Sequence, residues 1–353
     1  MRLAAFAAAA VASSPLLAQV PPPQQPVAPT REEIERPPQG QVQPPRSRLT
    51  VEGGVERAPC ALDRPEYRDI RFTLANVQFD DLRGLPADSL RPAYAPFVGR
   101  EQPVSVICEI RDRAATILRE AGYVASVEVP EQRIAEGNVR FQVLMAKLVG
   151  LRVRGDASGA ERTIAGYLER LTEDPVFNTQ RAERYLLLAD DLPGVDVRLS
   201  LRPAAGGEPG DLVGEVAVLR RRGALDFNVQ NYGSKALGRF GALLRGEIYD
   251  VTGMGDRTSL ALFSTLDFDE QQTVQLGHDF RVGSEGLTLG GSFTYSWTNP
   301  DLNLPGFDLK SETLLATVNA SYPLERSRSS SLIAGGGFDF VDQDVDINGI
   351  GLS

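Results

Sequence analysis

The stretch Leu287–Trp297 has the sequence Leu-Thr-Leu-Gly-Gly-Ser-Phe-Thr-Tyr-Ser-Trp, in which large apolar residues alternate with Gly, Ser and Thr. This period of two predicts a β-strand with one apolar and one polar face. Six further segments after residue 222 share the pattern. They are Leu225–Val229, Phe240–Ile248, Ser259–Leu266, Val274–Val282, Leu314–Tyr322 and Leu332–Phe340. Strands of this length with one apolar face predict part of an antiparallel transmembrane β-barrel.

The composition after residue 222 differs from that of the rest of the chain. The chain has a net charge of −10, and residues 223–353 hold 8 Lys and Arg against 17 Asp and Glu. In a barrel these charges would face a wet lumen, and outward Tyr249, Tyr295, Trp297 and Tyr322 would form an interfacial aromatic girdle. A soluble β-sandwich also alternates and stays the alternative at this point.

The first 59 residues predict an exported protein with a linker. Residues 1–18 combine a basic start, an Ala-rich apolar stretch and a small-residue end, as in a signal peptide. Residues 19–59 contain ten prolines among Gln, Glu and Arg. This composition predicts an extended linker, because it offers too little apolar area to offset the entropy of ordering.

Between residues 60 and 222 the chain predicts two α+β modules, 60–148 and 149–222. Each has the order strand, helix, helix, strand, strand, so the modules are read as a tandem repeat. In the first module the expected elements are Arg71–Phe79, Pro86–Val98, Val104–Ala121, Tyr123–Val129 and Val139–Leu148. In the second they are Leu148–Val153, Ala160–Leu171, Thr179–Ala189, Val195–Leu201 and Leu212–Leu219.

The residue inventory argues against several classes of function. The acidic balance disfavours nucleic-acid binding. One histidine, His278, and two cysteines offer no catalytic triad or metal-ligand cluster, so we expect no enzyme, cofactor or metal site. His278 lies between Leu276 and Phe280 on an apolar strand face, where a structural or interfacial role is expected. Cys60 and Cys108 predict a disulfide in an exported chain, with two separate thiols as the alternative.

Several short motifs resemble the haemolysin-activator family (ShlB/FhaC/HecB type). In the first module they are Pro59-Cys60, residues 70–74, Val106-Ile-Cys108, residues 122–132 and residues 137–141. In the strand region they are residues 231–234, Gly238-Arg239 and Gly253-Met-Gly-Asp256. The resemblance covers about residues 58–340, and the combination of motifs is more specific than any one of them.

The resemblance implies an outer-membrane pore of two-partner secretion within the outer membrane protein 85 superfamily. Such proteins have two periplasmic POTRA (polypeptide-transport-associated) domains and a 16-stranded barrel in outer-membrane lipid. They capture the secretion domain of an exported partner, an adhesin or cytolysin, and translocate it. About seven strands are predicted here, so the sequence is interpreted as C-terminally truncated. By analogy, the partner would pair with strand edges at Tyr123, Val124, Ser126 and Glu128 and at Val195, Val197 and Leu199.

Three alternatives stay open. One is an outer-membrane protein assembly or translocation factor of the same superfamily, although such factors usually have another number of POTRA units and lack the cysteine pair. A soluble periplasmic binding protein would need the last third to be a sandwich. An enzyme has the least support, because no nucleophile–base pair is present in the sequence.

Overall fold

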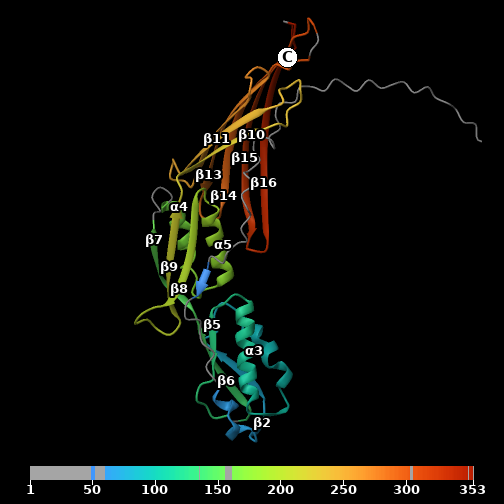
Figure 1. Cartoon of the computed structure of the whole chain (residues 1–353). Coiled ribbons are helices and arrows are strands. Elements are labelled where there is room, and N and C mark those ends of the chain that lie inside the picture. Colours follow the sequence, from blue (N-terminus) through green and yellow to red (C-terminus); the bar gives the residue numbers. More distant parts are fainter. Residues whose placement is uncertain are drawn as a thin grey trace, which may run out of the picture.

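The computed structural model describes residues 49–51, 60–134, 136–155, 161–302, 305–348 and 350–352. The predicted signal peptide and most of the predicted linker lie outside these residues. Two α+β modules and a curved β-sheet follow one another along the long axis of the molecule (Figure 1). Among the helices of the described residues, none is both long and apolar enough to cross a membrane.

The first module packs its main helix across one face of a three-stranded sheet. Its strands and α-helices are β2 (Arg71–Thr73), β3 (Asn76–Asp80), α2 (Arg91–Tyr94), β4 (Glu101–Pro103), α3 (Val106–Glu120), β5 (Ala125–Glu128) and β6 (Asn138–Met145). The 3-10 helices are η1 (Ala61–Asp63), η2 (Pro65–Tyr67), η3 (Ala87–Leu90) and η4 (Ala95–Phe97). The sheet order is β3-β6-β5, with β3 parallel and β5 antiparallel to β6. Ile107, Ile110, Ala114 and Leu118 form one fully buried helical stripe against this sheet.

The predicted strand Arg71–Phe79 is wrong in one respect, because the structure divides it into β2 and β3. β2 pairs with β4, whereas β3 joins the main sheet beside β6. The chain changes partner at Leu74 and Ala75, where Leu74 is fully buried and the Ala75 N–H donates to the carbonyl of Gly137. An alternating pattern cannot show that a strand changes sheet, because both halves keep the same period.

The second module repeats the arrangement with two α-helices against its sheet. Its elements are β7 (Lys147–Gly155), α4 (Glu161–Glu169), α5 (Thr179–Asp190), β8 (Val195–Pro203) and β9 (Asp211–Arg220). They form a sheet of order β8-β9-β7, extended at β8 by β1 (Leu49–Val51). Tyr167, Leu186 and Leu199 are among the side chains buried between helices and sheet. β1 comes from the segment that composition predicts to be linker, and it pairs in parallel with Leu199–Leu201.

A hydrogen-bonded joint connects the two modules where the end of α3 meets the start of α5. Asn178 caps α5, because its side-chain oxygen accepts from the N–H groups of Gln180 (3.0 Å) and Arg181 (3.2 Å). Its Nδ2 donates to the carbonyl of Ala121 (2.9 Å), and the Thr179 N–H donates to that of Gly122 (2.7 Å). The free carbonyls of one helix end are thereby satisfied by the capped end of the other.

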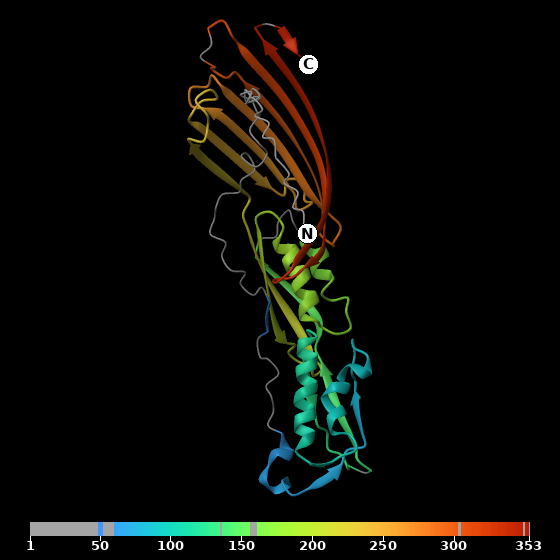
Figure 2. The same ribbon diagram turned by 90° about the vertical axis from the view of Figure 1, so that its right-hand side faces the viewer.

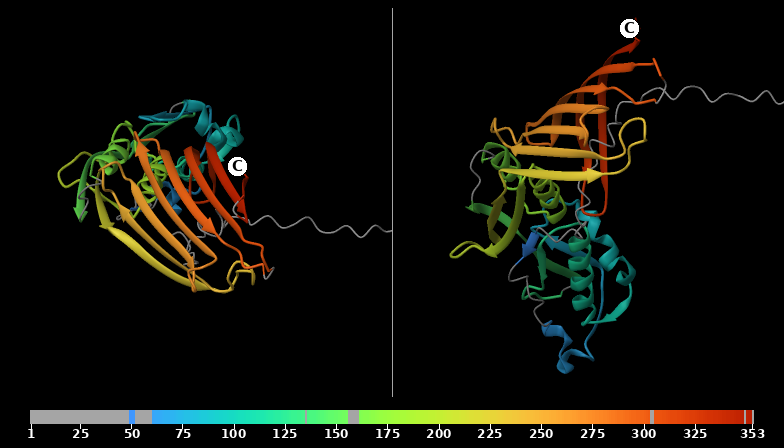
Figure 3. Two further views of the ribbon diagram at one scale, coloured as in Figure 1. Left: turned by 90° about the horizontal axis from the view of Figure 1, so that it is seen from above. Right: turned by 45° about the horizontal axis from the view of Figure 1, so that its top comes forward.

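The last region is a single antiparallel sheet of eight strands in chain order. They are β10 (Gly223–Gln230), β11 (Gly241–Tyr249), β12 (Arg257–Thr265), β13 (Gln271–Val282), β14 (Leu287–Thr298), β15 (Leu309–Arg326), β16 (Ser331–Ile347) and β17 (Ile350–Leu352). The predicted antiparallel arrangement is confirmed, and the seven predicted strands correspond to β10–β16. β17 adds an eighth strand of only three residues. The sheet curves like the wall of a partial barrel (Figures 2 and 3).

The two faces of this sheet differ in chemistry. Large apolar side chains such as Phe227 (69% exposed), Val318 (59%) and Phe338 (67%) lie on one face. The other face carries Ser, Thr and Gln that hydrogen-bond between strands, for example Thr273 to Ser296 (2.9 Å). Thr273 and Ser296 are each only 2% exposed, which indicates that the polar face is the crowded, concave one. An apolar outer face and a polar inner face are typical of a membrane barrel.

Helices α4 and α5 dock under the sheet through ion pairs. Arg326 of β15 donates to both carboxylate oxygens of Asp191 at 2.7 and 2.8 Å. Glu285, in the β13–β14 turn, accepts from the Tyr185 hydroxyl (3.1 Å) and lies 3.7 Å from Arg184. Burial and this hydrogen bond raise the pKa of Tyr185. The second module is therefore fixed to the near end of the sheet by several polar contacts.

The β11–β12 turn is held by a buried carboxylate. Asp256 is fully buried and accepts from the N–H groups of Val251 (3.0 Å) and Thr252 (2.8 Å), and from the Thr252 hydroxyl. Burial alone would raise the pKa of Asp256, but these hydrogen bonds hold it below its ordinary value. Burial raises the pKa of neighbouring Asp250, whose carboxylate lies 3.1 Å from Arg220 of β9. Hydrogen bonds within the turn therefore fix its shape, and the ion pair with Arg220 connects it to the second module.

Candidate functional site

A groove of about 1060 Å³ lies along the edge of the first module, and we call it the β5 groove. Helix α3 forms one wall and the edge strand β5 the other. Its remaining sides are formed by residues 60–62, by the chain after β5 as far as Ile134, and by Val51 and Thr179 from the second module. The groove therefore extends across the joint between the modules.

The backbone of β5 is paired on one side only. β6 pairs with Ala125–Glu128, and no strand among the described residues lies against the opposite side of β5. A strand edge carries unpaired N–H and C=O groups that a further extended segment can satisfy. In the structure this edge borders a groove, so backbone pairing and side-chain contacts would be available to the same ligand.

The four residues predicted for this edge differ in what they offer a ligand. Glu128 is exposed, and the Ser126 hydroxyl is buried without a hydrogen-bond partner. The Tyr123 hydroxyl instead donates to the carbonyl of Gly84 at 2.8 Å. Val124 packs against the core of the second module, so its side chain supports the joint. Of the four, Glu128 alone has an exposed side chain at the groove.

The second predicted edge, at β8, is partly covered by the chain itself, and partner binding along the rest of it stays a prediction. β1 already pairs with Leu199–Leu201, so that part of the edge is occupied by the chain itself. The side chains of Val195, Val197 and Leu199 are 8%, 0% and 1% exposed and belong to the core of the second module. Their alternation indicates a strand with one face in the core. It does not indicate which segment pairs with the edge of that strand.

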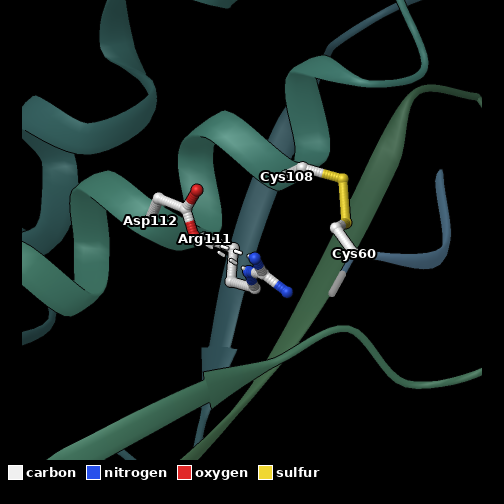
Figure 4. Close-up of a disulfide and its surroundings, with 4 residues drawn as sticks. All are labelled: Cys60, Cys108, Arg111 and Asp112. Atoms are coloured by element: carbon white, nitrogen blue, oxygen red, sulfur yellow. Dashed lines mark hydrogen bonds and ion pairs between the residues drawn. A yellow bond between two sulfur atoms is a disulfide. The ribbon is translucent and has the colours of Figure 1, made fainter. Parts of the chain in front are cut away.

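Cys60 and Cys108 form a disulfide (Figure 4). The bridge joins the segment before η1 to the first turn of α3, and Cys60 itself lines the groove. Arg111, one turn further along α3, donates to the Asp112 carboxylate at 2.9 and 3.1 Å. The disulfide therefore anchors residues 60–62 as a wall of the groove.

No cluster of three or more potential metal ligands occurs among residues that the structure describes. His278 lies on the apolar face of the sheet, where its Nδ1 is 3.0 Å from the Thr258 hydroxyl and its ring contacts Phe280. Sequence reasoning missed the strand β1. The only signal for it was the pair Leu49 and Val51, two apolar residues separated by one in a proline-rich segment.

The comparisons with known proteins identify this architecture. Residues 72–145 match the family model described as "POTRA domain, ShlB-type". The first module is a ShlB-type POTRA domain. The matched range includes α3, β5 and β6, so the β5 groove is built on this domain. This match confirms the resemblance to the haemolysin-activator family that the sequence motifs indicate.

Similar proteins span more than this chain. It is 25% identical over 211 residues to the heme/hemopexin transporter protein HuxB of Haemophilus influenzae, covering 56% of the chain and 36% of that protein. The structure of CdiB from Escherichia coli matches 84% of this chain over 55% of the CdiB chain, with a TM-score of 0.67 and 15% identity. The structure of CdiB from Acinetobacter baumannii matches 80% of this chain over 55% of the CdiB chain, with a TM-score of 0.60 and 16% identity. The chain thus spans about a third of the curated relative and about half of these structures.

These matches agree with the predicted fold and location. POTRA architecture is followed by an eight-stranded antiparallel sheet that resembles part of a β-barrel. The prediction of an outer-membrane protein with its POTRA region in the periplasm is consistent with these matches. In that location the apolar face of the sheet would meet lipid, and the β5 groove would lie on the periplasmic side.

Proposed function

We propose that this chain forms part of a two-partner secretion pore, which binds an exported protein in the periplasm and translocates it across the outer membrane. The single observation that carries the proposal is the vacant β5 edge above its groove. It lies in a periplasmic module that the joint and the ion pairs of Asp191 and Glu285 connect to the barrel-like sheet. A partner captured there would be held in a module that the second module connects to the sheet (Figure 1).

Capture would occur by strand addition. An extended segment of the partner would pair its backbone with β5 and place alternate side chains in the groove. Because β8 is occupied by β1 over Leu199–Leu201, the first POTRA domain is proposed as the main recognition site. The polar concave face then offers a wet path across the membrane. The partner is proposed to be a large exported protein of the adhesin or cytolysin type, as the family resemblance implies.

Site-specific photo-crosslinking tests the proposal. A benzophenone side chain at Glu128, which is exposed at the groove, should crosslink to the exported partner in intact cells. The same group at Arg100, which is exposed and outside the groove, is the matched control and should not crosslink.

Deletion of residues 60–221 should abolish secretion of the partner. Secretion at normal levels from that deletion, or equal crosslinking at both positions, would contradict the proposal.

A further inference from the structure

The ladder between β5 and β6 determines which backbone groups of β5 are free for a partner. Just before β5, the Val124 carbonyl accepts from the Ala146 N–H at 2.8 Å, in the same register as the ladder itself. Hydrogen-bonded pairs alternate along an antiparallel ladder, so the even-numbered residues of β5 point their N–H and C=O groups toward β6. The N–H and C=O groups of Ala125 and Val127 therefore point to the vacant edge.

Backbone pairing between the two strands stops at Pro130. Continued two residues past Glu128 in the same register, the ladder would set Pro130 opposite Arg140 of β6. Pro130 has no N–H, so it cannot donate to the Arg140 carbonyl, and a full hydrogen-bonded pair cannot form at this level. The N–H and C=O groups of Arg140 need another partner.

The side chain of Gln132 takes the place of the missing strand residue. Its Nε2 donates to the Arg140 carbonyl at 2.8 Å, and its Oε1 accepts from the Arg140 N–H at 2.8 Å. Nε2 also reaches the Pro130 carbonyl, at 3.4 Å. One side-chain amide thus bridges the two strands where their backbones no longer pair. The bridge anchors the chain directly after β5 and so fixes the position of Val129, which precedes Pro130.

Val129 extends the vacant edge by one pairing position. It precedes a proline, which favours an extended backbone, and its side chain packs against the core of the first module. It continues the odd-numbered series of Ala125 and Val127, so its N–H and C=O point to the vacant side. Its backbone has no hydrogen-bond partner among the described residues, and it lines the β5 groove. These three residues form what we call the capture edge, about 13 Å long.

We propose that Gln132 is a positioning residue for partner capture, which sets the far end of the capture edge. By bridging Pro130 and Arg140 it keeps the backbone groups of Val129 in line with the strand. An added strand then has three pairing positions on β5 in place of two. The inference rests on the proposed function, and it gives the partner a paired segment of about five residues, alongside residues 125–129.

A double-mutant cycle tests whether Gln132 acts through Val129. The probe is the fluorescein-labelled peptide Thr-Val-Thr-Val-Thr-Val-Thr-amide, and fluorescence anisotropy measures its affinity for the full chain in detergent micelles. Val129→Pro removes an N–H that points to the vacant edge, and it should weaken binding about fivefold, the effect of one net hydrogen bond. In a Gln132→Leu background the Val129 groups are no longer positioned, so the same change should weaken binding less than twofold.

Ala125→Pro is the matched control, because it removes an outward N–H at the opposite end of the capture edge. It should weaken binding about fivefold in both backgrounds. Gln132→Glu is a second variant of the bridge. Its carboxylate still accepts from the Arg140 N–H but cannot donate to either carbonyl, so it should behave as Gln132→Leu does. Arg133→Gln, at an exposed neighbour outside the groove, should bind as wild type. Circular dichroism at the assay temperature checks that each variant is folded.

The failure of this inference and the failure of strand capture are distinguishable. Equal weakening by Val129→Pro in both backgrounds would show that Gln132 does not act through Val129. That result would overturn the inference while capture at β5 stands. Binding that neither proline variant changes, or no binding at millimolar concentration, would overturn strand capture at β5 and with it the site of the proposed function.

Discussion

Asn178 is the residue whose replacement should loosen the joint between the two POTRA modules most directly. Asn178→Ala removes a helix N-cap, which contributes about 1 kcal/mol, and the hydrogen bond to Ala121, which contributes a further ~1 kcal/mol. The first turn of α5 and the last turn of α3 should therefore open more easily by about 2 kcal/mol. That corresponds to a loss of hydrogen-exchange protection of about 30-fold at the start of α5.

Asn178→Asp separates the two contributions. A carboxylate still accepts from Gln180 and Arg181 and so keeps the cap, but it cannot donate to the Ala121 carbonyl. Hydrogen-exchange mass spectrometry of the full chain in micelles should show weakened protection near Tyr123 in both variants. At the start of α5 protection should weaken mainly in the alanine variant. Protection within twofold of wild type at residues 179–182 of Asn178→Ala would refute the reasoning.

Four further predictions follow from the described contacts. Gly122→Ala should destabilise the same joint by at least about 1 kcal/mol, because φ is 85° and a Cβ would lie 2.9 Å from the Asn178 oxygen; thermal unfolding of the modules would show it. Cys60→Ser with Cys108→Ser should lower the stability of the first module by up to about 4 kcal/mol for a separation of 48 residues, and denaturant titration measures this. Folding lowers the pKa of Asp256, so its contribution to the free energy of unfolding is complete above the ordinary value of 3.8 and is lost as pH falls through the folded pKa. Amide hydrogen exchange in the 250–256 turn should therefore become faster as pH falls through that range. Asp256→Asn should remove this pH dependence. Arg326→Gln should weaken docking of the second module, and a distance probe between α5 and β15 should broaden, with exposed Lys310→Gln as the control.

Most of the longer strands could be predicted from the sequence, because they carry a period of two over five or more residues. β17 could not, since three residues are too few to establish a period. β1 is equally short, and it is a strand only because β8 offers an edge from a distant part of the chain. Short strands, and strands that depend on a distant pairing partner, therefore leave no recognisable pattern in the sequence.

The candidate site was predictable in its location and less so in its details. The alternation of Tyr123–Val129 gave the strand, and the vacant edge agrees with that interpretation. The burial of Val124 in the second module was not predictable, because it depends on how the modules meet. Asn178 carried no recognisable signal beyond an N-cap residue, and its second hydrogen bond reaches a carbonyl 57 residues away.

In the proposed pore, the hydroxyl-rich face of the sheet has a consequence for the speed of transport. Thr273, Ser296 and Thr294 already satisfy one another or Gln275 across the strands. Neutral hydrogen bonds to such groups exchange with water at a net gain of only about 1 kcal/mol each. A chain sliding along the hydroxyl-lined part of this wall would meet many shallow minima. That part of the wall would act as a low-friction surface, on which dwell times stay short.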